Sequence, residues 1–191
     1  MEADAAMTHQ SDTPEVVFVD ASEDVEGALK SVDAEVVGVD VERADADRYF
    51  RRAALVQVGV AGRCVLLDGV TLDQLPQLGA FLGPDRLAVL HAVENDLEPL
   101  QAKGVDPARI ADTAIAAAML GLPTGLGGLL QEVLDIELDG DKSHYQRADW
   151  EERPLTSGMA AYAAGDVVHL PALWDELAQR LDETDRMGWY E

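Results

Sequence analysis

The sequence predicts an α/β domain in which a mixed β-sheet is flanked by helices on both faces. Two short β-branched and aliphatic runs joined by a tight turn indicate a hairpin, and the later apolar runs alternate with amphipathic helical segments. A chain of 191 residues with 48% hydrophobic content can bury one core of ordinary size. The sequence shows no internal repeat and no linker to a second domain, so we expect one domain with short appendages.

The N-terminal region combines a polar tail with the first strand and helix. Residues 1–14 are acidic and poor in large apolar side chains, so we expect a disordered acidic tail ahead of a domain at 15–191. The β-branched run 16–19 predicts a strand, and Ser22 is a suitable N-cap for a helix over 22–32.

Three further runs complete the strand-rich half of the chain. Residues 36–39 are apolar throughout, which is typical of a central strand buried on both faces. The runs 54–60 and 64–68 flank a tight turn at 61–63, which predicts an antiparallel hairpin. The sheet is therefore expected to be mixed.

Helices alternate with one more strand in the middle of the chain. A helix over 72–82 is expected to stop at a Gly-Pro pair, and residues 87–91 predict a fourth buried strand. Further helices are expected at 94–103, where Gly104 ends the helix, at 113–120 after a cap-like Asp112, and at 126–134.

The C-terminal region predicts a long helical segment that opens at Thr156. Its apolar residues recur every three or four positions, which places them on one helix face over a core: Ala163, Val167, Leu170, Trp174, Leu177 and Leu181. Pro171 predicts a kink or a restart. A nucleotide-binding Rossmann domain is the competing fold, but the glycine-rich run 125–128 lies between two helices, not between the first strand and helix.

The composition is strongly acidic. Fourteen Lys and Arg against 37 Asp and Glu give a formal charge of −23, so the surface as a whole should repel a polyanion. Any nucleic acid must then bind at a local site, such as a metal ion or a small basic cluster. A GC-rich genome or a salty cytoplasm could also produce this surplus of acidic residues.

The single Cys64 cannot form an internal disulfide, and without a signal peptide or an apolar run of about 18 residues we expect a cytoplasmic protein with no membrane partner.

A few acids follow buried strands at positions that can converge. Asp40 and Glu42 lie two apart at the end of the 36–39 strand, so both side chains point to one face. Asp96 follows the 87–91 strand by a short turn, although an acid there could simply favour a helix start. Tyr162 and Asp166 are four apart on the long helix and stack on one side, although a tyrosine beside a core often only packs its ring.

Convergence of these acids would require positive charge between them. Two carboxylates about 4 Å apart repel by roughly 4 kcal/mol at an effective dielectric near 20. Oxygen ligands without His or Cys favour Mg²⁺ or Mn²⁺ over zinc. Two such ions about 3.5–4 Å apart can activate water and stabilise the leaving oxygen in phosphodiester hydrolysis.

At these residues the sequence resembles the DEDDy 3'-5' exonucleases, and among them the ribonuclease D family, from about Val16 to the C-terminus. The order and spacing of the matching segments carry the resemblance: Val39-Asp40-Val41-Glu42, Leu55-Val56-Gln57-Val58, His91 through Leu97, and Tyr162 through Val167, with further likeness at Asp112-Thr113, Lys142 and 149–155. The resemblance implies a ribonuclease H-like exonuclease fold, which agrees with the mixed sheet.

The resemblance also implies roles for five residues. Asp40, Glu42 and Asp166 would hold the first of two divalent ions, Mg²⁺ or Mn²⁺, Asp40 would bridge to the second, and Asp96 would support the second directly or through water. Tyr162 would orient or deprotonate the attacking water. An ordinary tyrosine pKa near 10 favours orientation at neutral pH. The products would be nucleoside 5'-monophosphates released from RNA 3' ends.

Other residues are candidates for substrate binding. His91 could instead be a core histidine, and Gln57 could only support strand pairing. Lys142 and Arg153 precede the long helix in an irregular segment, where phosphate contact competes with a surface salt bridge. The one dense basic patch, which could steer substrate, comprises Arg43, Arg48, Arg51 and Arg52.

Three functions therefore remain open at this point. The leading hypothesis is a metal-dependent 3'-5' exoribonuclease. A DNA exonuclease of the same fold is the alternative within the class, because nothing in the sequence reads a 2'-hydroxyl. A non-catalytic acidic module that binds divalent cations would have no need of Tyr162.

Ribonuclease D carries further nucleic-acid-binding domains after the exonuclease domain, and the chain stops where they would begin, either as a natural single-domain form resembling nanoribonucleases or as a fragment. We therefore expect short or single-stranded RNA ends to be favoured.

Overall fold

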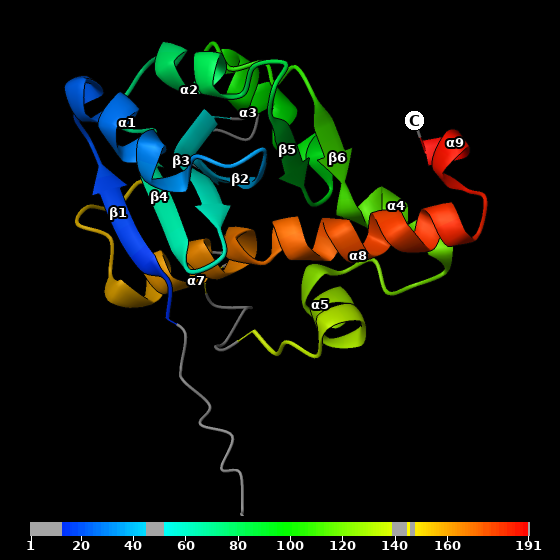
Figure 1. Cartoon of the computed structure of the whole chain (residues 1–191). Coiled ribbons are helices and arrows are strands. Elements are labelled where there is room, and N and C mark those ends of the chain that lie inside the picture. The colour runs from blue at the N-terminus through cyan, green and yellow to red at the C-terminus, as the bar shows by residue number, and fades with distance from the viewer. Residues whose placement is uncertain (1–12, 45–51, 139–144, 146–147, 191) are drawn as a thin grey trace, which may run out of the picture.

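A six-stranded mixed sheet forms the centre of the molecule (Figure 1). The computed structural model describes residues 13–44, 52–138, 145 and 148–190. The strands lie in the order β1-β4-β3-β2-β5-β6. Their bounds are Glu15–Val19 for β1, Val36–Ala44 for β2, Arg52–Val60 for β3, Arg63–Asp68 for β4, Leu87–Leu90 for β5 and Ile110–Asp112 for β6.

The hairpin and the mixed strand directions are confirmed. The β3 and β4 strands pair antiparallel, and so do β2 and β3, whereas β1 runs parallel to β4 and both β5 and β6 extend the sheet in parallel beyond β2. The central strand β2 thus joins an antiparallel half to a parallel half. It is longer than the apolar run 36–39 because it continues through the acidic residues that follow.

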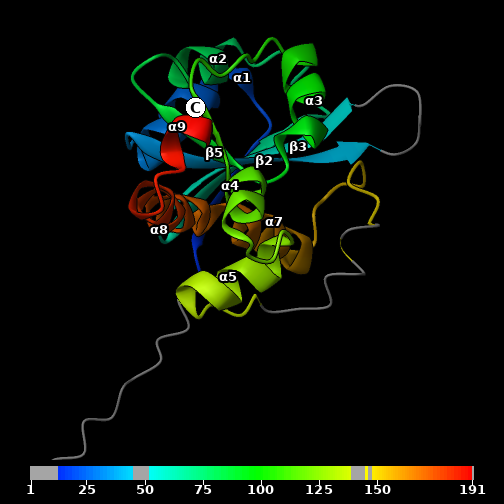
Figure 2. The same cartoon turned by 90° about the vertical axis from the view of Figure 1, so that its right-hand side faces the viewer.

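Helices cover both faces of the sheet, as expected (Figure 2). One face carries α1 (Ser22–Leu29), α2 (Pro76–Phe81) and α3 (Leu97–Ala102). The other face carries α4 (Thr113–Leu120), α5 (Leu126–Leu134), α7 (Ser157–Val168) and α8 (Leu170–Glu183), and the short helix α9 (Met187–Tyr190) follows α8 near the C-terminal end. None of the helices among the described residues is long and apolar enough to cross a membrane.

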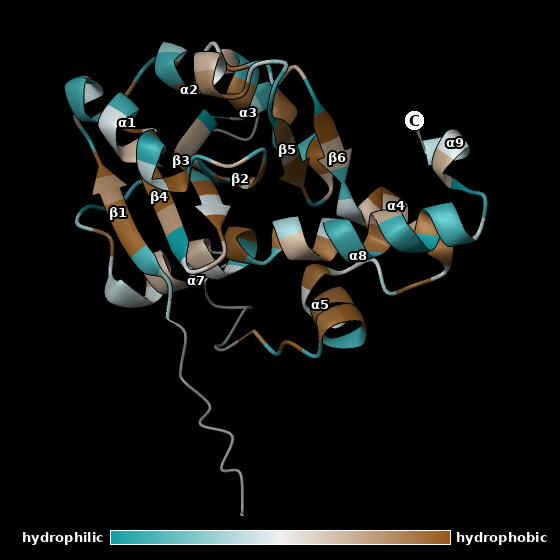
Figure 3. Ribbon diagram, in the orientation of Figure 1, coloured by the Kyte–Doolittle hydropathy of each residue, from teal (hydrophilic) through white to brown (hydrophobic). Residues whose placement is uncertain are grey.

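The side chains of alternate strand residues build two separate cores. On β2, Val37, Val39 and Val41 face the layer of α1, α2 and α3, so Asp40 and Glu42 face the layer of α7. The strands are largely hydrophobic, whereas α8 alternates hydrophobic with hydrophilic bands (Figure 3). The pattern fits the burial on α8, where Leu170, Leu173, Leu177 and Leu181 are buried.

Two glycines allow α7 to lie directly on the sheet. A Cβ on Gly38 would come within 2.1 Å of the Val167 carbonyl oxygen, and one on Gly59 within 2.5 Å of a Val167 methyl carbon. No other residue type fits at such distances, because real Cβ contacts are longer. Gly38 lies two residues before Asp40 on the same face of β2, so this close approach brings α7 over the acidic end of the strand.

Several local expectations need correction. Ser22 is the first residue of α1 and not its cap, because Ala21 occupies the N-cap position, and the chain tightens into a 3-10 helix at Lys30–Val32. The expected helix over 94–103 is broken into a 3-10 turn at Val93–Asn95 and the short α3. The restart expected at Pro171 is confirmed, with the proline in the first turn of α8, where it removes no helical hydrogen bond.

Candidate active site

The acidic residues of β2 and α7 line one pocket of about 710 Å³. Its walls come from the end of β2, the turn after β5, the N-terminal end of α5 and one side of α7. All five residues expected at a metal-dependent site line this pocket: Asp40, Glu42, Asp96, Tyr162 and Asp166. The structure therefore brings together residues that are up to 126 positions apart in the chain.

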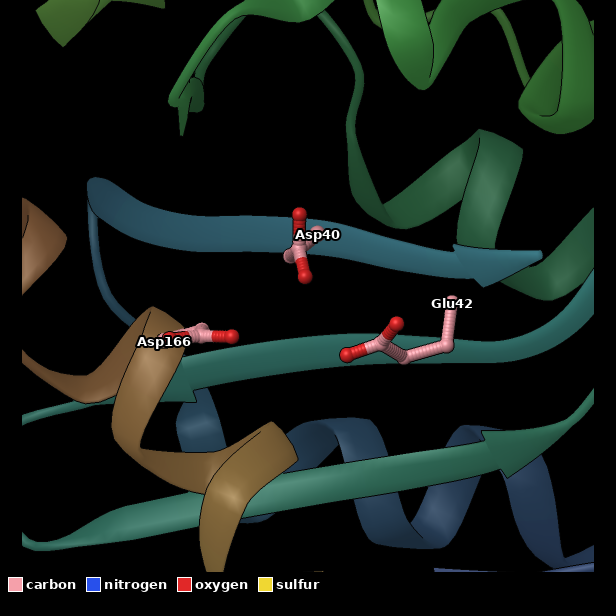
Figure 4. A group of neighbouring side chains, drawn as sticks. All are labelled: Asp40, Glu42 and Asp166. Atoms are coloured by element: carbon pink, nitrogen blue, oxygen red, sulfur yellow. The ribbon is translucent and has the colours of Figure 1, made fainter. Parts of the chain in front are cut away.

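Asp40, Glu42 and Asp166 form the centre of the pocket. One carboxylate oxygen from each lies within 4.8 Å of the others, and Figure 4 shows the Glu42 and Asp166 side chains extending toward each other beside Asp40. The alternation of β2 turns Asp40 and Glu42 to the same side, and α7, seated on Gly38, supplies Asp166 from above. This group could hold a cation.

Burial raises the pKa of two of these carboxyl groups, and mutual repulsion adds to the effect at Glu42. Burial raises the pKa of Asp40 to about 6. Burial, together with the charges of Asp40, Asp166 and Asp96, raises the pKa of Glu42 to about 10. Without a cation the site therefore resists full ionisation, and binding of a divalent cation has to displace protons.

Asp96 reaches the same pocket from the turn after β5. It occupies the N-cap position of α3, but its side chain accepts no capping hydrogen bond, so capping does not account for its orientation. The residue is 3% exposed, and its Oδ2 is buried without a hydrogen-bond partner among the described residues. Burial and the charge of Asp40 raise the pKa of Asp96 to about 9. A buried carboxylate oxygen without a donor fits a site that receives a cation.

Asp112 holds the turn that carries Asp96. Its carboxylate accepts hydrogen bonds from the backbone N–H groups of Ala92 and Val93, at 3.2 and 2.9 Å, and caps α4 through those of Ala114 and Ile115. Ala92 has a φ of 61°, a left-handed conformation that is unfavourable for a residue with a Cβ. The four hydrogen bonds at Asp112 stabilise this turn and so fix where Asp96 points.

Tyr162 lines the pocket beside the carboxylates and contacts two aromatic rings in tilted arrangements. Its ring centroid lies 5.4 Å from that of Tyr145 and 6.1 Å from that of Trp150. Burial, the charges of Asp166 and Glu42, and a hydrogen bond from its hydroxyl to Asp166 raise the pKa of Tyr162 well above its usual range. The hydroxyl is therefore protonated at neutral pH and can orient a neighbouring group through hydrogen bonds.

Comparison with known proteins decides the family. The model of the 3'-5' exonuclease family matches residues 16–182, which include all the acidic residues of the pocket. The chain belongs to the 3'-5' exonuclease family.

Relatives of this exonuclease domain include longer proteins named ribonuclease D. The chain is 36% identical over 157 residues to ribonuclease D of Xanthomonas oryzae, an alignment that covers 80% of this chain and 42% of the relative. It is 32% identical over 191 residues to ribonuclease D of Gluconacetobacter diazotrophicus, covering 96% of this chain and 48% of the relative. The chain thus spans less than half the length of these curated relatives.

Solved structures show the same arrangement of helices and strands. Escherichia coli RNase D, described as an exoribonuclease involved in structured RNA processing, is 28% identical with a TM-score of 0.78, over 92% of this chain and 46% of that one. The catalytic core of RRP6 from Trypanosoma brucei is 27% identical with a TM-score of 0.82, over 93% and 50% of the two chains. The expected ribonuclease H-like fold is confirmed.

His91 lines the pocket of the exonuclease domain beside Asp96. Its Nδ1 lies 2.9 Å from the hydroxyl of Thr113, and that hydroxyl donates to the backbone carbonyl of Leu90. Because a hydroxyl has one proton, it must accept from His91, which places a proton on Nδ1. The ring is thereby oriented by β5 and the start of α4.

Two other substrate-binding candidates, Gln57 and Arg153, do not line the pocket of the exonuclease domain. Gln57 lies opposite Asp40 on β3, fully buried, with neither amide atom hydrogen-bonded within the described part of the chain. Arg153 donates to the carbonyl oxygens of Ala54 and Trp150 and forms an ion pair with buried Asp68. Arg153 therefore anchors the segment before α7 to the sheet. Lys142, Arg48 and Arg51 lie outside the described residues.

Other residues line the pocket that the sequence did not single out as site residues. Trp150 lies beside Tyr162, Asn95 precedes Asp96, Leu170 begins α8, and the glycine-rich start of α5 forms a wall at residues 125–128. In the sequence, the position of these glycines served only as evidence against a Rossmann fold. A separate signal in the sequence could have found Trp150, because it stands in the segment 149–155 that resembles the ribonuclease D family.

Proposed function

We propose that this exonuclease domain is a metal-dependent 3'-5' exoribonuclease that releases nucleoside 5'-monophosphates from short or single-stranded RNA ends. The convergence of Asp40, Glu42 and Asp166 in one pocket with Tyr162 and the unpartnered Asp96 oxygen carries the proposal. The ribonuclease D relatives support RNA as the substrate. In the reaction, a water oxygen forms a bond to phosphorus, the bond from phosphorus to the 3'-oxygen breaks, and the shortened strand keeps a 3'-hydroxyl.

The donor set fits divalent cations. Asp40, Glu42 and Asp166 would hold one ion, while Asp40 and Asp96 would serve a second. All donors are carboxylate oxygens, which suits Mg²⁺ or Mn²⁺. Two such ions supply an activated water and charge stabilisation for the leaving oxygen. Together they also offset the charge of the pocket where the phosphate has to enter.

Tyr162 would orient the attacking water through its hydroxyl. In the metal-free pocket the pKa of Tyr162 is raised, which favours orientation of the water over removal of its proton by the phenol. Its ring is held between Tyr145 and Trp150, so the hydroxyl has a fixed place beside Asp166. A fixed donor beside the reacting phosphate lowers the barrier through orientation.

The preference for short or single-stranded ends follows from the size and charge of the domain. One pocket of about 710 Å³ accommodates few nucleotides, and a net charge of −23 disfavours an extended polyanion elsewhere on the surface. No residue of the described pocket is assigned as a hydrogen-bond partner for a 2'-hydroxyl. RNA specificity therefore has to be tested against matched DNA substrates, which a DNA exonuclease would digest.

A length series of labelled oligonucleotides tests the proposal. RNAs labelled at the 5' end, from a dinucleotide to a transfer RNA, and matched DNAs are incubated with Mg²⁺ or Mn²⁺ and with free or blocked 3' ends. We expect stepwise shortening of RNA with a free 3' end, faster on short substrates, and loss of this activity in Asp40→Asn. Glu35→Gln is the control, because Glu35 is exposed and outside the pocket.

Three outcomes would contradict the proposal. Equal or faster digestion of DNA would make the domain a DNA exonuclease. Binding of Mn²⁺ without turnover of any 3' end would favour a non-catalytic metal-binding module. Full activity in a folded Asp40→Asn protein would show that the carboxylate cluster is not the catalytic site.

A further inference from the structure

A cationic side chain lies within the acidic pocket, at Arg43. It follows Glu42 on β2, where a β-bulge shifts the pairing with β3 so that Glu42 lies opposite Leu55 and Arg43 opposite Ala53. Bulges re-aim side chains at the ends of paired strands. Arg43 is half-buried and lines the same pocket as the carboxylates. Of the described residues that line this pocket, it is the one Lys or Arg.

The positive charge of Arg43 acts on acids from two parts of the pocket, Glu42 on β2 and Asp96 in the turn after β5. Its guanidinium lowers the pKa of Glu42 and of Asp96, against the larger effect of burial that raises both. Arg43 lines the pocket together with Glu42 from the acidic end of β2 and Asp96 from the turn after β5. Despite this proximity, no ion pair of Arg43 with any carboxylate is found in the described ranges.

Other arginines of the molecule are engaged differently. Five of those described form an ion pair with an Asp or Glu side chain: Arg52, Arg63, Arg86, Arg153 and Arg180. Arg43 differs from these five because no carboxylate holds it in such a pair within the described chain, and it differs from Arg109, for which no ion pair is found there either, because it lines the acidic pocket. A guanidinium that is exposed to a pocket retains its donors for a ligand with anionic oxygens.

The position along β2 indicates which phosphate Arg43 can meet. It lies three residues beyond Asp40, which corresponds to about 10 Å along a strand. It is thus displaced from the centre formed by Asp40 and Asp166. An enzyme that removes one nucleotide from a 3' end cleaves the last phosphodiester, so a neighbouring phosphate can lie only on the 5' side of the cleaved one.

We propose that Arg43 is a substrate-binding residue that contacts the phosphate on the 5' side of the scissile phosphate. This inference rests on the proposed exonuclease function. The contact favours substrates with at least two internucleotide phosphates over those with one. It also gives an acidic protein a local point of attraction for a polyanion, at the mouth of its most acidic pocket.

Two minimal substrates test the contact. A dinucleoside monophosphate has only the scissile phosphate, whereas a trinucleoside diphosphate also has the phosphate on its 5' side. The ratio of kcat/KM for the longer over the shorter substrate is measured with saturating Mn²⁺ for the wild type, Arg43→Gln and Arg43→Lys. Arg63→Gln is the matched control, because Arg63 pairs with Glu15 outside the pocket.

We expect Arg43→Gln to lower this ratio about tenfold, as loss of one hydrogen bond to a charged group would, and Arg43→Lys to lower it less. The slope of log(kcat/KM) against log salt for the longer substrate should also become shallower by about 0.7, the value for one phosphate contact with a single strand. Arg63→Gln should retain the wild-type ratio.

Three results would overturn the inference. An unchanged ratio in Arg43→Gln would show that the side chain does not contact the second phosphate. An equal loss on both substrates, together with a higher Mn²⁺ requirement, would show that Arg43 acts on the carboxylates instead. A wild type that cleaves neither substrate, nor any longer RNA, would remove the proposed function and the inference with it, an outcome separable from the first two because those require an active wild type.

Discussion

Removal of the Glu42 charge should stabilise the metal-free protein, and increasingly so as the pH rises. The pKa of Glu42 is raised from 4.5 to about 10, first by burial and then by the charges of Asp40, Asp166 and Asp96. A carboxyl group whose folded pKa is raised contributes stability below its unfolded pKa and loses it as the pH rises through its folded pKa. Glu42→Gln keeps the shape of the side chain and removes this dependence.

The magnitude follows from the pKa shift and agrees with simple electrostatics. At about 1.4 kcal/mol per pKa unit, the metal-free wild type should lose about 5 kcal/mol relative to Glu42→Gln between the acid range and pH 8, and about 1 kcal/mol of this by pH 5.5. Two carboxylates separated by 4.8 Å, the limit within the cluster, repel by about 3.5 kcal/mol at an effective dielectric of 20. The expected difference therefore combines the cost of burying the Glu42 carboxyl, which is the larger cause, with one or two such repulsions.

Urea unfolding in EDTA at pH 5.5, 7 and 8.5 measures the effect. The difference in unfolding free energy between Glu42→Gln and the wild type should grow across this range, whereas Glu35→Gln, which removes an exposed acid, should show no such growth. Saturating Mn²⁺ should restore the wild type above Glu42→Gln, because the ion replaces repulsion with attraction. A difference that does not change with pH would refute the electrostatic account of the pocket.

Three other substitutions test individual residues. Tyr162→Phe keeps the ring against Tyr145 and Trp150, so steady-state kinetics should show a fall in kcat of about 10²-fold without loss of the folded state. Gln57→Met removes two buried amide atoms that lack partners, so urea unfolding should show a gain of about 1 kcal/mol, and a loss would indicate a partner for the amide. Arg153→Gln leaves Asp68 unpaired and should lower the unfolding free energy by about 3 kcal/mol at pH 7. Burial raises the pKa of Asp68, but the hydrogen bond and the charge of Arg153, together with hydrogen bonds from Val70 and Thr71, lower it below its usual value. The loss caused by Arg153→Gln should therefore shrink toward acid pH, where Asp68 is protonated.

The placement of α7 links the fold to the site. Gly38 and Gly59 let the helix lie directly on β2 and β3, and this distance decides whether Asp166 can reach Asp40 and Glu42. A larger residue at Gly38 would move the helix outward at the Val167 carbonyl, one residue from Asp166. The acidic cluster therefore depends on two residues that carry no functional group.

The amino-acid sequence by itself determined the elements with strong local signals. The hairpin of β3 and β4, the apolar strand β5, the cap at Asp112 and the restart at Pro171 are all encoded within a few residues, as turn chemistry, continuous apolar runs or a missing N–H. Alternation along a strand likewise sufficed to place Asp40 and Glu42 on one face.

Tertiary structure decided what depends on distant contacts. The helix expected at 94–103 is instead a 3-10 turn and the short α3. The left-handed conformation of Ala92 before them persists because Asp112, twenty residues away, accepts the N–H groups of Ala92 and Val93. Arg153, expected as a phosphate contact, is instead engaged by Asp68 and the Ala54 carbonyl. The reverse holds for Arg43, one of four arginines in a polar segment, which lines the pocket of the carboxylates where the pairing of β2 with β3 shifts register. Sequence patterns specify which side chains share a local face, but the partner that each charge meets depends on segments brought together only by the fold.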